Sequence, residues 1–143
     1  MLKKIFNRER KNTELINDKS TLIAAILIHA AKIDDNYSSN EKEIIKKALI
    51  DLKMTTLHKS EELLKQAEIK EKESNQILEF TKEIKKNSME FRLRIIEILW
   101  KIVYSDKSSD IYESNLMRRI CGLLYVSDKD SGMIKLKVKN LTK

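Results

Sequence analysis

Apolar side chains recur at the three-to-four-residue spacing of amphipathic helices along almost the whole chain. Short polar or charged stretches separate these runs, and several carry residue types that begin helices. Ser38 followed by Glu41 has the spacing of a capping box, and Ser127 followed by Asp130 has a similar capping pattern. We therefore predict an all-α fold of about seven helices. The expected core positions include Leu22, Ile26, Ile45, Leu64, Phe80, Leu99, Leu116 and Leu124.

Two boundaries in the middle of the chain are predicted from the same kind of pattern. Thr55 or Thr56 is expected to cap a helix whose apolar stripe starts at Leu57. Residues 69–74 are mostly charged, and we expect them to break or kink the chain before the next apolar stripe starts at Ile77. The middle of the chain is thus predicted to contain two helices.

An internal repeat is present at an offset of 72 residues. The offset aligns the apolar stripe of the first helix with that of a later one, and it pairs Asp34 with Asp106 and Glu41 with Glu113. Each half of the chain is therefore predicted to contain an apolar helix, an acidic loop and a capped helix. We predict a single-domain bundle in which two pseudo-equivalent helical hairpins are joined by charged middle helices.

The composition excludes several classes of protein. The chain of 143 residues has two glycines and no proline, which argues against hairpin-rich folds and glycine-rich phosphate-binding loops. A single cysteine leaves no disulfide framework and no cysteine-based zinc site. No apolar run approaches the length of a transmembrane helix or of the hydrophobic part of a signal peptide. We therefore expect a cytoplasmic protein.

The formal net charge of +7 comes from the two ends of the chain. Residues 1–20 hold six basic and three acidic side chains, and residues 133–143 hold four lysines and no acid. We divide the chain into a basic N-terminal segment (1–20), a helical domain (21–133) and a basic C-terminal tail (134–143). The domain itself is neutral, which argues against nucleic-acid binding. The basic ends either contact an anionic membrane or are solvated tails without a partner.

Two long stretches resemble the TerB family of tellurite-resistance-type proteins. They are residues 27–49 (LIHAAKIDDNYSSNEKEIIKKAL) and residues 95–128 (IIEILWKIVYSDKSSDIYESNLMRRICGLLYVSD), and the resemblance extends over roughly 22–133. It implies an all-helical fold of about seven helices, which is also found as the N-terminal module of a membrane-anchored J-domain co-chaperone. The chain departs from the family pattern at Asp35 and Lys107, where the family usually has glycine.

The resemblance also implies a metal site, formed by Asp34, Glu41, Asp106 and Glu113. Residues 34–38 and 106–110 each place an oxygen-bearing side chain at alternate positions, with a glutamate three residues further on. Such hard donors favour Ca²⁺ or Mg²⁺. Neither loop is an EF-hand, because the glycine at the sixth position and the glutamate at the twelfth are both missing.

A purely structural interpretation of the same residues stays open. Glu41 and Glu113 both lie three residues after a capping side chain, so each completes a capping box without any metal. Asp34 and Asp106 follow apolar helices, where a carboxylate opposes the helix dipole, but they can accept hydrogen bonds within their own loops. If the two loops meet, their carboxylates repel one another, and a bound cation relieves that repulsion.

These observations predict a non-enzymatic interaction module with a protein partner. Its acidic loops are candidates for binding a divalent cation, and the resemblance links it to metal or envelope stress. The alternative is an adaptor at the inner membrane surface, or a co-chaperone-type protein-binding domain, that uses the basic ends while the loops are structural. A metal-dependent hydrolase ranks last, since the sequence has the acids but no recognisable general base, nucleophile motif or organic-cofactor motif.

Overall fold

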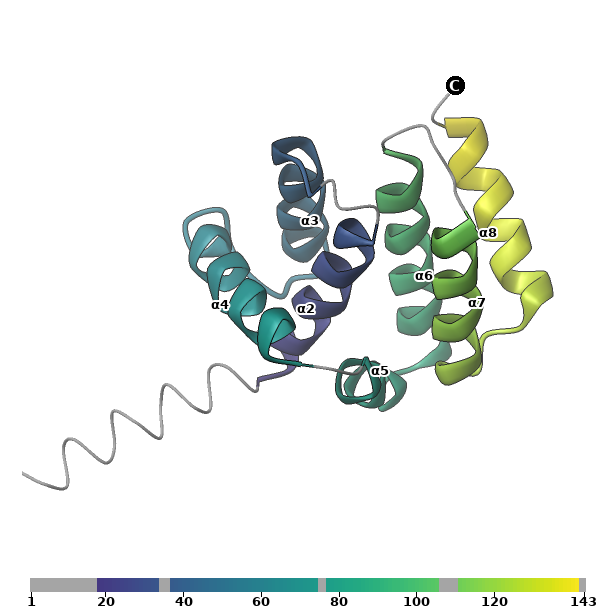
Figure 1. Ribbon diagram of the computed structural model, residues 1–143, viewed down its shortest axis with the longest axis horizontal. Coiled ribbons are helices and arrows are strands. Elements are labelled where there is room, and N and C mark those ends of the chain that lie inside the picture. Colours follow the sequence, from purple (N-terminus) through teal and green to yellow (C-terminus); the bar gives the residue numbers. More distant parts are fainter. Residues whose placement is uncertain (1–17, 34–36, 75–76, 106–110, 142–143) are drawn as a thin grey trace, which may run out of the picture.

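The structure is a computed structural model, and it describes residues 18–33, 37–74, 77–105 and 111–141 (Figure 1). These residues form seven α-helices and no strand, which confirms the predicted all-α fold. The helices are α2 (Lys19–Lys32), α3 (Ser39–Asp51), α4 (Ser60–Glu73), α5 (Leu78–Lys85), α6 (Met89–Tyr104), α7 (Ile111–Leu123) and α8 (Asp128–Leu141).

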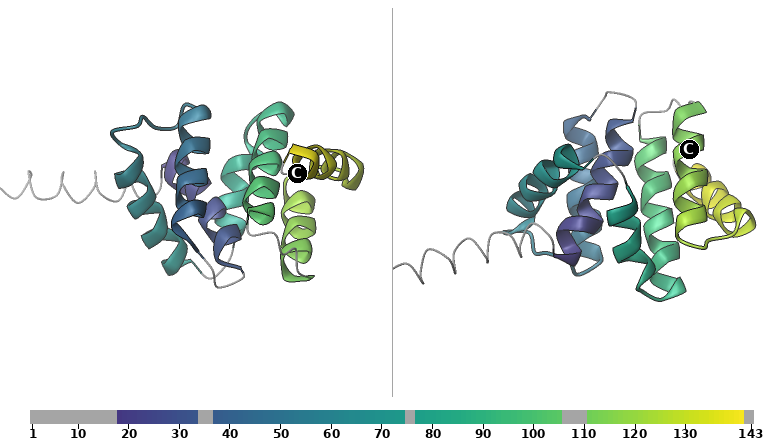
Figure 2. Two further views of the ribbon diagram at one scale, coloured as in Figure 1. Left: turned by 90° about the horizontal axis from the view of Figure 1, so that it is seen from above. Right: turned by 60° about the horizontal axis from the view of Figure 1, so that its bottom comes forward.

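The helices form two three-helix units that pack against each other. Helices α2, α3 and α4 all contact one another, and so do α6, α7 and α8 (Figures 1 and 2). The units meet where α2 and α3 contact α6. The short helix α5 lies between the units and contacts α2 in one and α7 in the other. The interior is thus continuous from one unit to the other.

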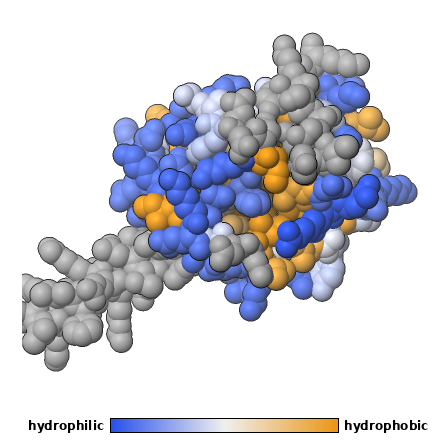
Figure 3. Space-filling model, in the orientation of Figure 1, coloured by the Kyte–Doolittle hydropathy of each residue, from blue (hydrophilic) through white to orange (hydrophobic). Residues whose placement is uncertain are grey.

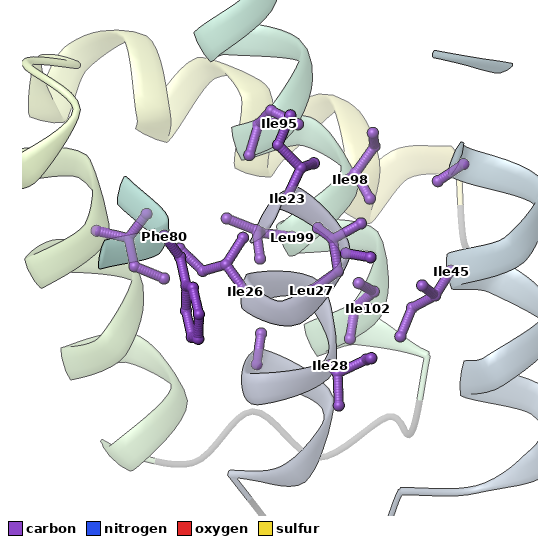
Figure 4. Close-up of a cluster of buried hydrophobic side chains, with 14 of the residues drawn as sticks. Ile23, Ile26, Leu27, Ile28, Ile45, Phe80, Ile95, Ile98, Leu99 and Ile102 are labelled. Carbon is purple, nitrogen blue, oxygen red and sulfur yellow. The ribbon is translucent and has the colours of Figure 1, made fainter. Parts of the chain in front are cut away.

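Helix α2 lies at the centre of the molecule. Ten of its fourteen residues are buried, in keeping with a helix that is apolar on almost every face. Its side chains meet residues of α3, α5 and α6 in one cluster (Figure 4). None of the helices in the described ranges is both long enough and apolar enough to span a membrane. The cluster includes Ile23, Ile26, Leu27, Ile45, Phe80, Ile95, Leu99 and Ile102.

Polar side chains cap the helices largely as predicted. Ser38 and Glu41 form the expected capping box at the start of α3. The Ser127 hydroxyl accepts a hydrogen bond from the backbone N–H of Asp130 at 3.1 Å, as the pattern before α8 indicates. Ser88 plays the same part at α6, where its hydroxyl accepts from a backbone N–H in the first turn. Each such cap contributes about 1 kcal/mol to helix stability.

Helix α4 differs from the prediction at both ends. It begins at Ser60, after a turn in which the carbonyl of Thr56 accepts a hydrogen bond from the backbone N–H of Lys59. Leu57 precedes the helix and is 75% exposed, so it does not start the apolar stripe. Neither threonine caps the helix, because the chain closes this turn before the helix starts. The helix then continues through residues 69–73. Lysine and glutamate are good helix formers, so a charged stretch does not by itself end a helix.

The boundary drawn at residue 133 falls inside a helix. Residues 134–141 form the second half of α8, and Val138 is fully buried in the core. The sequence obscures this, because the apolar residues of this segment alternate with lysines and do not form a single helical stripe. The part assigned to a basic C-terminal tail is therefore helical as far as Leu141 and packs on the domain.

Helices α3 and α7 end in the same backbone motif. Lys53 and Tyr125 both have positive φ, of 61° and 56°, and they are the non-glycine residues with this conformation in the described ranges. In each case the backbone N–H of the next residue bonds to a carbonyl five positions earlier, at 2.9 Å. This is a Schellman motif with a left-handed residue at its C′ position. The two motifs lie 72 residues apart, at the offset of the sequence repeat.

Replacing Lys53 by glycine is expected to stabilise the protein by about 0.5–1 kcal/mol. A left-handed conformation costs an L-residue about 1–2 kcal/mol, and glycine avoids this cost while losing some backbone entropy. The midpoint of denaturant unfolding measures the gain. Lys47→Gly is the matched control, because Lys47 is exposed in the interior of α3 and its replacement should cost about 1 kcal/mol. Equal losses in both variants would contradict the prediction.

Candidate functional site

Glu41 is the predicted ligand whose side chain the structure describes. It is buried in the first turn of α3, and its Oε1 accepts hydrogen bonds from the backbone N–H and the hydroxyl of Ser38, both at 3.2 Å. Asp34 and Asp106 lie outside the described residues. Glu113 lies in the first turn of α7, and its side chain is also outside them. Glu41 is therefore placed in a structural cap, and nothing described places it beside the other three.

A polar network next to Glu41 joins α2, α3 and α4. The Tyr37 hydroxyl donates a hydrogen bond to Glu68 of α4 at 2.9 Å. Burial, together with this hydrogen bond and nearby carboxylates, raises the pKa of Tyr37, so the hydroxyl keeps its proton and remains a donor. The ammonium groups of Lys32 and Lys42 lie 5.9 and 4.9 Å from the centre of the Tyr37 ring. The tyrosine is thus held by a carboxylate at one end and by two cations over its ring.

Glu71 connects α4 to α2 in the same region. One of its carboxylate oxygens lies 2.8 Å from Lys32 Nζ, and the other lies 3.3 Å from His29 Nδ1. The sequence analysis did not find this network. Two pairs of residues in the sequence could have indicated it. His29 and Lys32 are three residues apart and share one face of α2, and Glu68 and Glu71 have the same spacing on α4.

The described residues do not form a metal site. No three histidine, cysteine, aspartate or glutamate side chains in ranges 18–33, 37–74, 77–105 and 111–141 are arranged to hold an ion. Carboxylate oxygens suit Ca²⁺ and Mg²⁺, but the described atom Glu41 Oε1 already accepts two hydrogen bonds from Ser38. The carboxylate of Glu71 is likewise engaged by a lysine and a histidine. The described residues therefore do not form a cation site by themselves.

A groove of 470 Å³ lies between α3 and α6, where the two units meet. Its apolar lining comes from Ile44 and Ala48 on α3 and Ile98 on α6, and charged and polar side chains line the rest. Figure 3 shows apolar surface in the middle of the face that it presents, with hydrophilic surface around it. The lining comprises Asn40, Ile44, Lys47, Ala48, Asp51, Arg94, Glu97, Ile98, Lys101 and Ser105.

The groove is lined by one residue next to each acidic loop in the sequence. Asn40 is adjacent to Glu41 in the first turn of α3, and Ser105 directly precedes Asp106 at the end of α6. Both Asn40 and Ser105 line the groove. The Arg94 guanidinium in the first half of α6 donates to the Asp51 carbonyl at the end of α3 at 3.5 Å, so the two helices run in opposite directions. Asn40 and Ser105 therefore lie at the same end of the groove, which the sequence repeat alone does not establish.

Cys121 is buried in the second unit and does not resemble a nucleophile. Burial raises the pKa of its thiol, which therefore stays protonated. The Cys121 thiol donates to Ser131 Oγ at 3.3 Å, and the indole N–H of Trp100 donates to the same oxygen at 3.2 Å. These three side chains form a small buried polar cluster that joins α6, α7 and α8.

The arrangement of helices and groove defines an all-α module built from two packed three-helix units. Over residues 20–136 the chain matches the family model described as Tellurite resistance protein TerB. This match covers most of the chain, which therefore belongs to the TerB family. No curated protein and no solved structure matches the chain.

Proposed function

We propose that this chain is a non-enzymatic interaction module that binds a protein partner and responds to divalent cations. The observation that carries the proposal is the groove between α3 and α6, with its apolar lining and charged margins next to both acidic loops. It is built on helices, and a concave site of this kind suits a partner's side chains. Family membership supports a role in tellurite resistance or a related metal or envelope stress.

Three side chains of types that often act in catalysis have structural roles here, which supports the non-enzymatic assignment. Cys121 is a buried thiol with a raised pKa, Glu41 caps a helix, and His29 lies beside Glu71. Each of these groups has a structural partner that accounts for its position. Turnover of a generic phosphoester substrate that disappears in Asp34→Asn would contradict this assignment.

The cation proposal rests on Asp34, Glu41, Asp106 and Glu113 as carboxylate ligands for Ca²⁺ or Mg²⁺. Two observations support it. The segments next to both loops line one groove, and Glu41 lies at the N-terminal end of α3, next to the first loop. If the two loops meet, their carboxylates repel one another, and a bound cation offsets that repulsion.

The thermal unfolding midpoint tests this proposal directly. Wild-type protein is measured in EDTA and with Ca²⁺, Mg²⁺, Mn²⁺ or Zn²⁺, beside the double variant Asp34→Asn/Asp106→Asn. A ligand at 100 times its dissociation constant stabilises the native state by about 2.7 kcal/mol. For a chain of this length we expect the midpoint to rise by several degrees in the wild type and by much less in the double variant.

Glu41→Gln separates the two parts that Glu41 can play. Glutamine at this position still completes a capping box with Ser38, so the fold in EDTA should keep nearly all of its stability. The variant loses the negative charge that a cation requires, so the cation-dependent rise should shrink. Glu41→Ala removes the cap as well and should lower the midpoint even in EDTA. No rise with any cation in the wild type would overturn the cation proposal.

A further inference from the structure

The outward face of α8 carries exposed apolar side chains. Met133 and Leu136 are 63% and 60% exposed, and Leu141 at the end of the helix is 69% exposed. The opposite face carries Ser131 and Val138, which are buried where α8 packs on α6 and α7. Met133 and Leu136 are three residues apart, so they are neighbours on the surface of the helix. Large apolar side chains grouped in this way on a surface mark an interaction site.

Lysines surround this apolar group. Lys129 lies four residues before Met133 on the same face, and Lys137 and Lys139 follow Leu136. The two acids of α8, Asp128 and Asp130, lie in its first turn, where they complement the helix dipole. Residues 131–141 contain three lysines and no acid. The part of α8 that carries the exposed apolar side chains is therefore basic beyond its first turn.

Helix α6 engages two lysines of α8, Lys135 and Lys137. Lys135 Nζ lies 5.1 Å above the ring of Trp100, and Lys137 Nζ lies 3.2 Å from Glu97. The long side chains thus leave the helix sideways and do not cover Met133 or Leu136, both of which stay exposed. Apolar side chains in the middle with amphipathic lysines beside them are typical of helices that lie at a membrane interface.

The shape of the molecule indicates what this face contacts. Helix α8 lies at the outer edge of the second unit, so its outward face is convex (Figure 2). A convex face suits a flat, deformable surface, whereas the concave groove between α3 and α6 suits a partner's side chains. Two copies of this face would bring lysines against lysines, which disfavours self-association.

We propose that the outward face of α8 binds the surface of an anionic lipid bilayer. Met133 and Leu136 enter the headgroup region, and Lys129 on the same face contacts lipid phosphates. The proposal goes beyond the cation-responsive module described above and does not depend on its acidic loops. It also differs from a membrane role of the basic ends as unstructured segments, because it requires the helical face and its apolar side chains.

Co-sedimentation of the full chain with vesicles tests this proposal. Binding is measured with vesicles of equimolar phosphatidylcholine and phosphatidylglycerol, and with vesicles of phosphatidylcholine alone. The wild type should bind the anionic vesicles and dissociate at high salt, because surface charges are screened. Met133→Ser/Leu136→Ser should bind at least about tenfold more weakly, since it removes most of the apolar area that would enter the bilayer. Lys129→Glu should also weaken binding, because it replaces a positive charge near the anionic lipid by a negative one.

Matched variants elsewhere on the surface serve as controls. Leu57→Ser/Ile69→Ser removes two exposed apolar side chains outside α8, and Lys72→Glu reverses one exposed charge on α4. Both should bind vesicles as the wild type does. All of these positions are exposed, so circular dichroism should show the native helix content in every variant.

Three outcomes would overturn the proposal. If the wild type does not bind anionic vesicles, the outward face of α8 does not bind lipid, and an acidic protein partner becomes the alternative. If it binds neutral vesicles equally well, the lysines have no part in recognition. If Met133→Ser/Leu136→Ser binds as the wild type does, binding belongs to another part of the chain. None of these outcomes affects the cation test, whose readout is the unfolding midpoint without lipid.

Discussion

Replacement of Phe80 by alanine is expected to lower the free energy of unfolding by about 3–5 kcal/mol. Phe80 is 1% exposed and comes from α5, the helix that contacts both three-helix units (Figure 4). The substitution removes a whole ring from a close-packed interior and leaves a cavity that the surrounding helices only partly close. The loss is a large fraction of the total stability of a domain of this size.

The unfolding midpoint measures this loss, and we expect it to fall by about 10 °C or more. Leu78→Ala is the matched control on the same helix, because Leu78 is 47% exposed. It should cost less than about 1 kcal/mol, since much of its apolar surface is already in contact with water. Similar losses in the two variants would show that α5 is not anchored through Phe80.

Ser131→Ala is expected to cost about 1–3 kcal/mol, although it removes only one oxygen atom. That oxygen accepts hydrogen bonds from the indole N–H of Trp100 and the thiol of Cys121. All three side chains are buried, so the donors lose their acceptor in a place that water does not reach. The cost arises from the unsatisfied indole N–H more than from lost packing.

A double-mutant cycle with Trp100→Phe separates the cost of the unsatisfied indole N–H from the cost of lost packing. Phenylalanine has no N–H, so Ser131→Ala should cost less in the Trp100→Phe background than in the wild type, and the two losses should not add. Ser114→Ala is the control for the change of residue type, because Ser114 is exposed inside α7 and alanine is the better helix former. Additive losses in the cycle would show that the hydrogen bond does not contribute to stability.

Local patterns predicted most of the fold. The helical class, the capping box at Ser38 and the core stripe of α2 all depend on residues within a few positions of one another. The start of α4 was predicted wrongly, because several polar residues before Ser60 are acceptable caps and the competing turn at Thr56 has no distinctive pattern. The burial of Val138 was missed because it depends on packing against distant helices.

The candidate site was less predictable, for a physical reason. The ligand prediction rested on spacing within each loop, and spacing does not reveal what else a carboxylate binds. Glu41 shows this, since its predicted cap is described in the structure and its predicted metal role remains a prediction. The network around Tyr37 depends on pairs such as Lys32 and Glu71, which are 39 residues apart. Only the fold brings such pairs together.

The central position of α2 has a consequence for synthesis on the ribosome. Chains are made from the N-terminus, so α2 emerges before the helices that bury it. Its partners α3, α4 and α5 follow in order, but part of its surface packs on α6, which is complete only at Tyr104. Until that point the nascent chain exposes one of its most apolar segments. A chain truncated before α6 would keep that surface exposed permanently and would be a good substrate for chaperones and proteases.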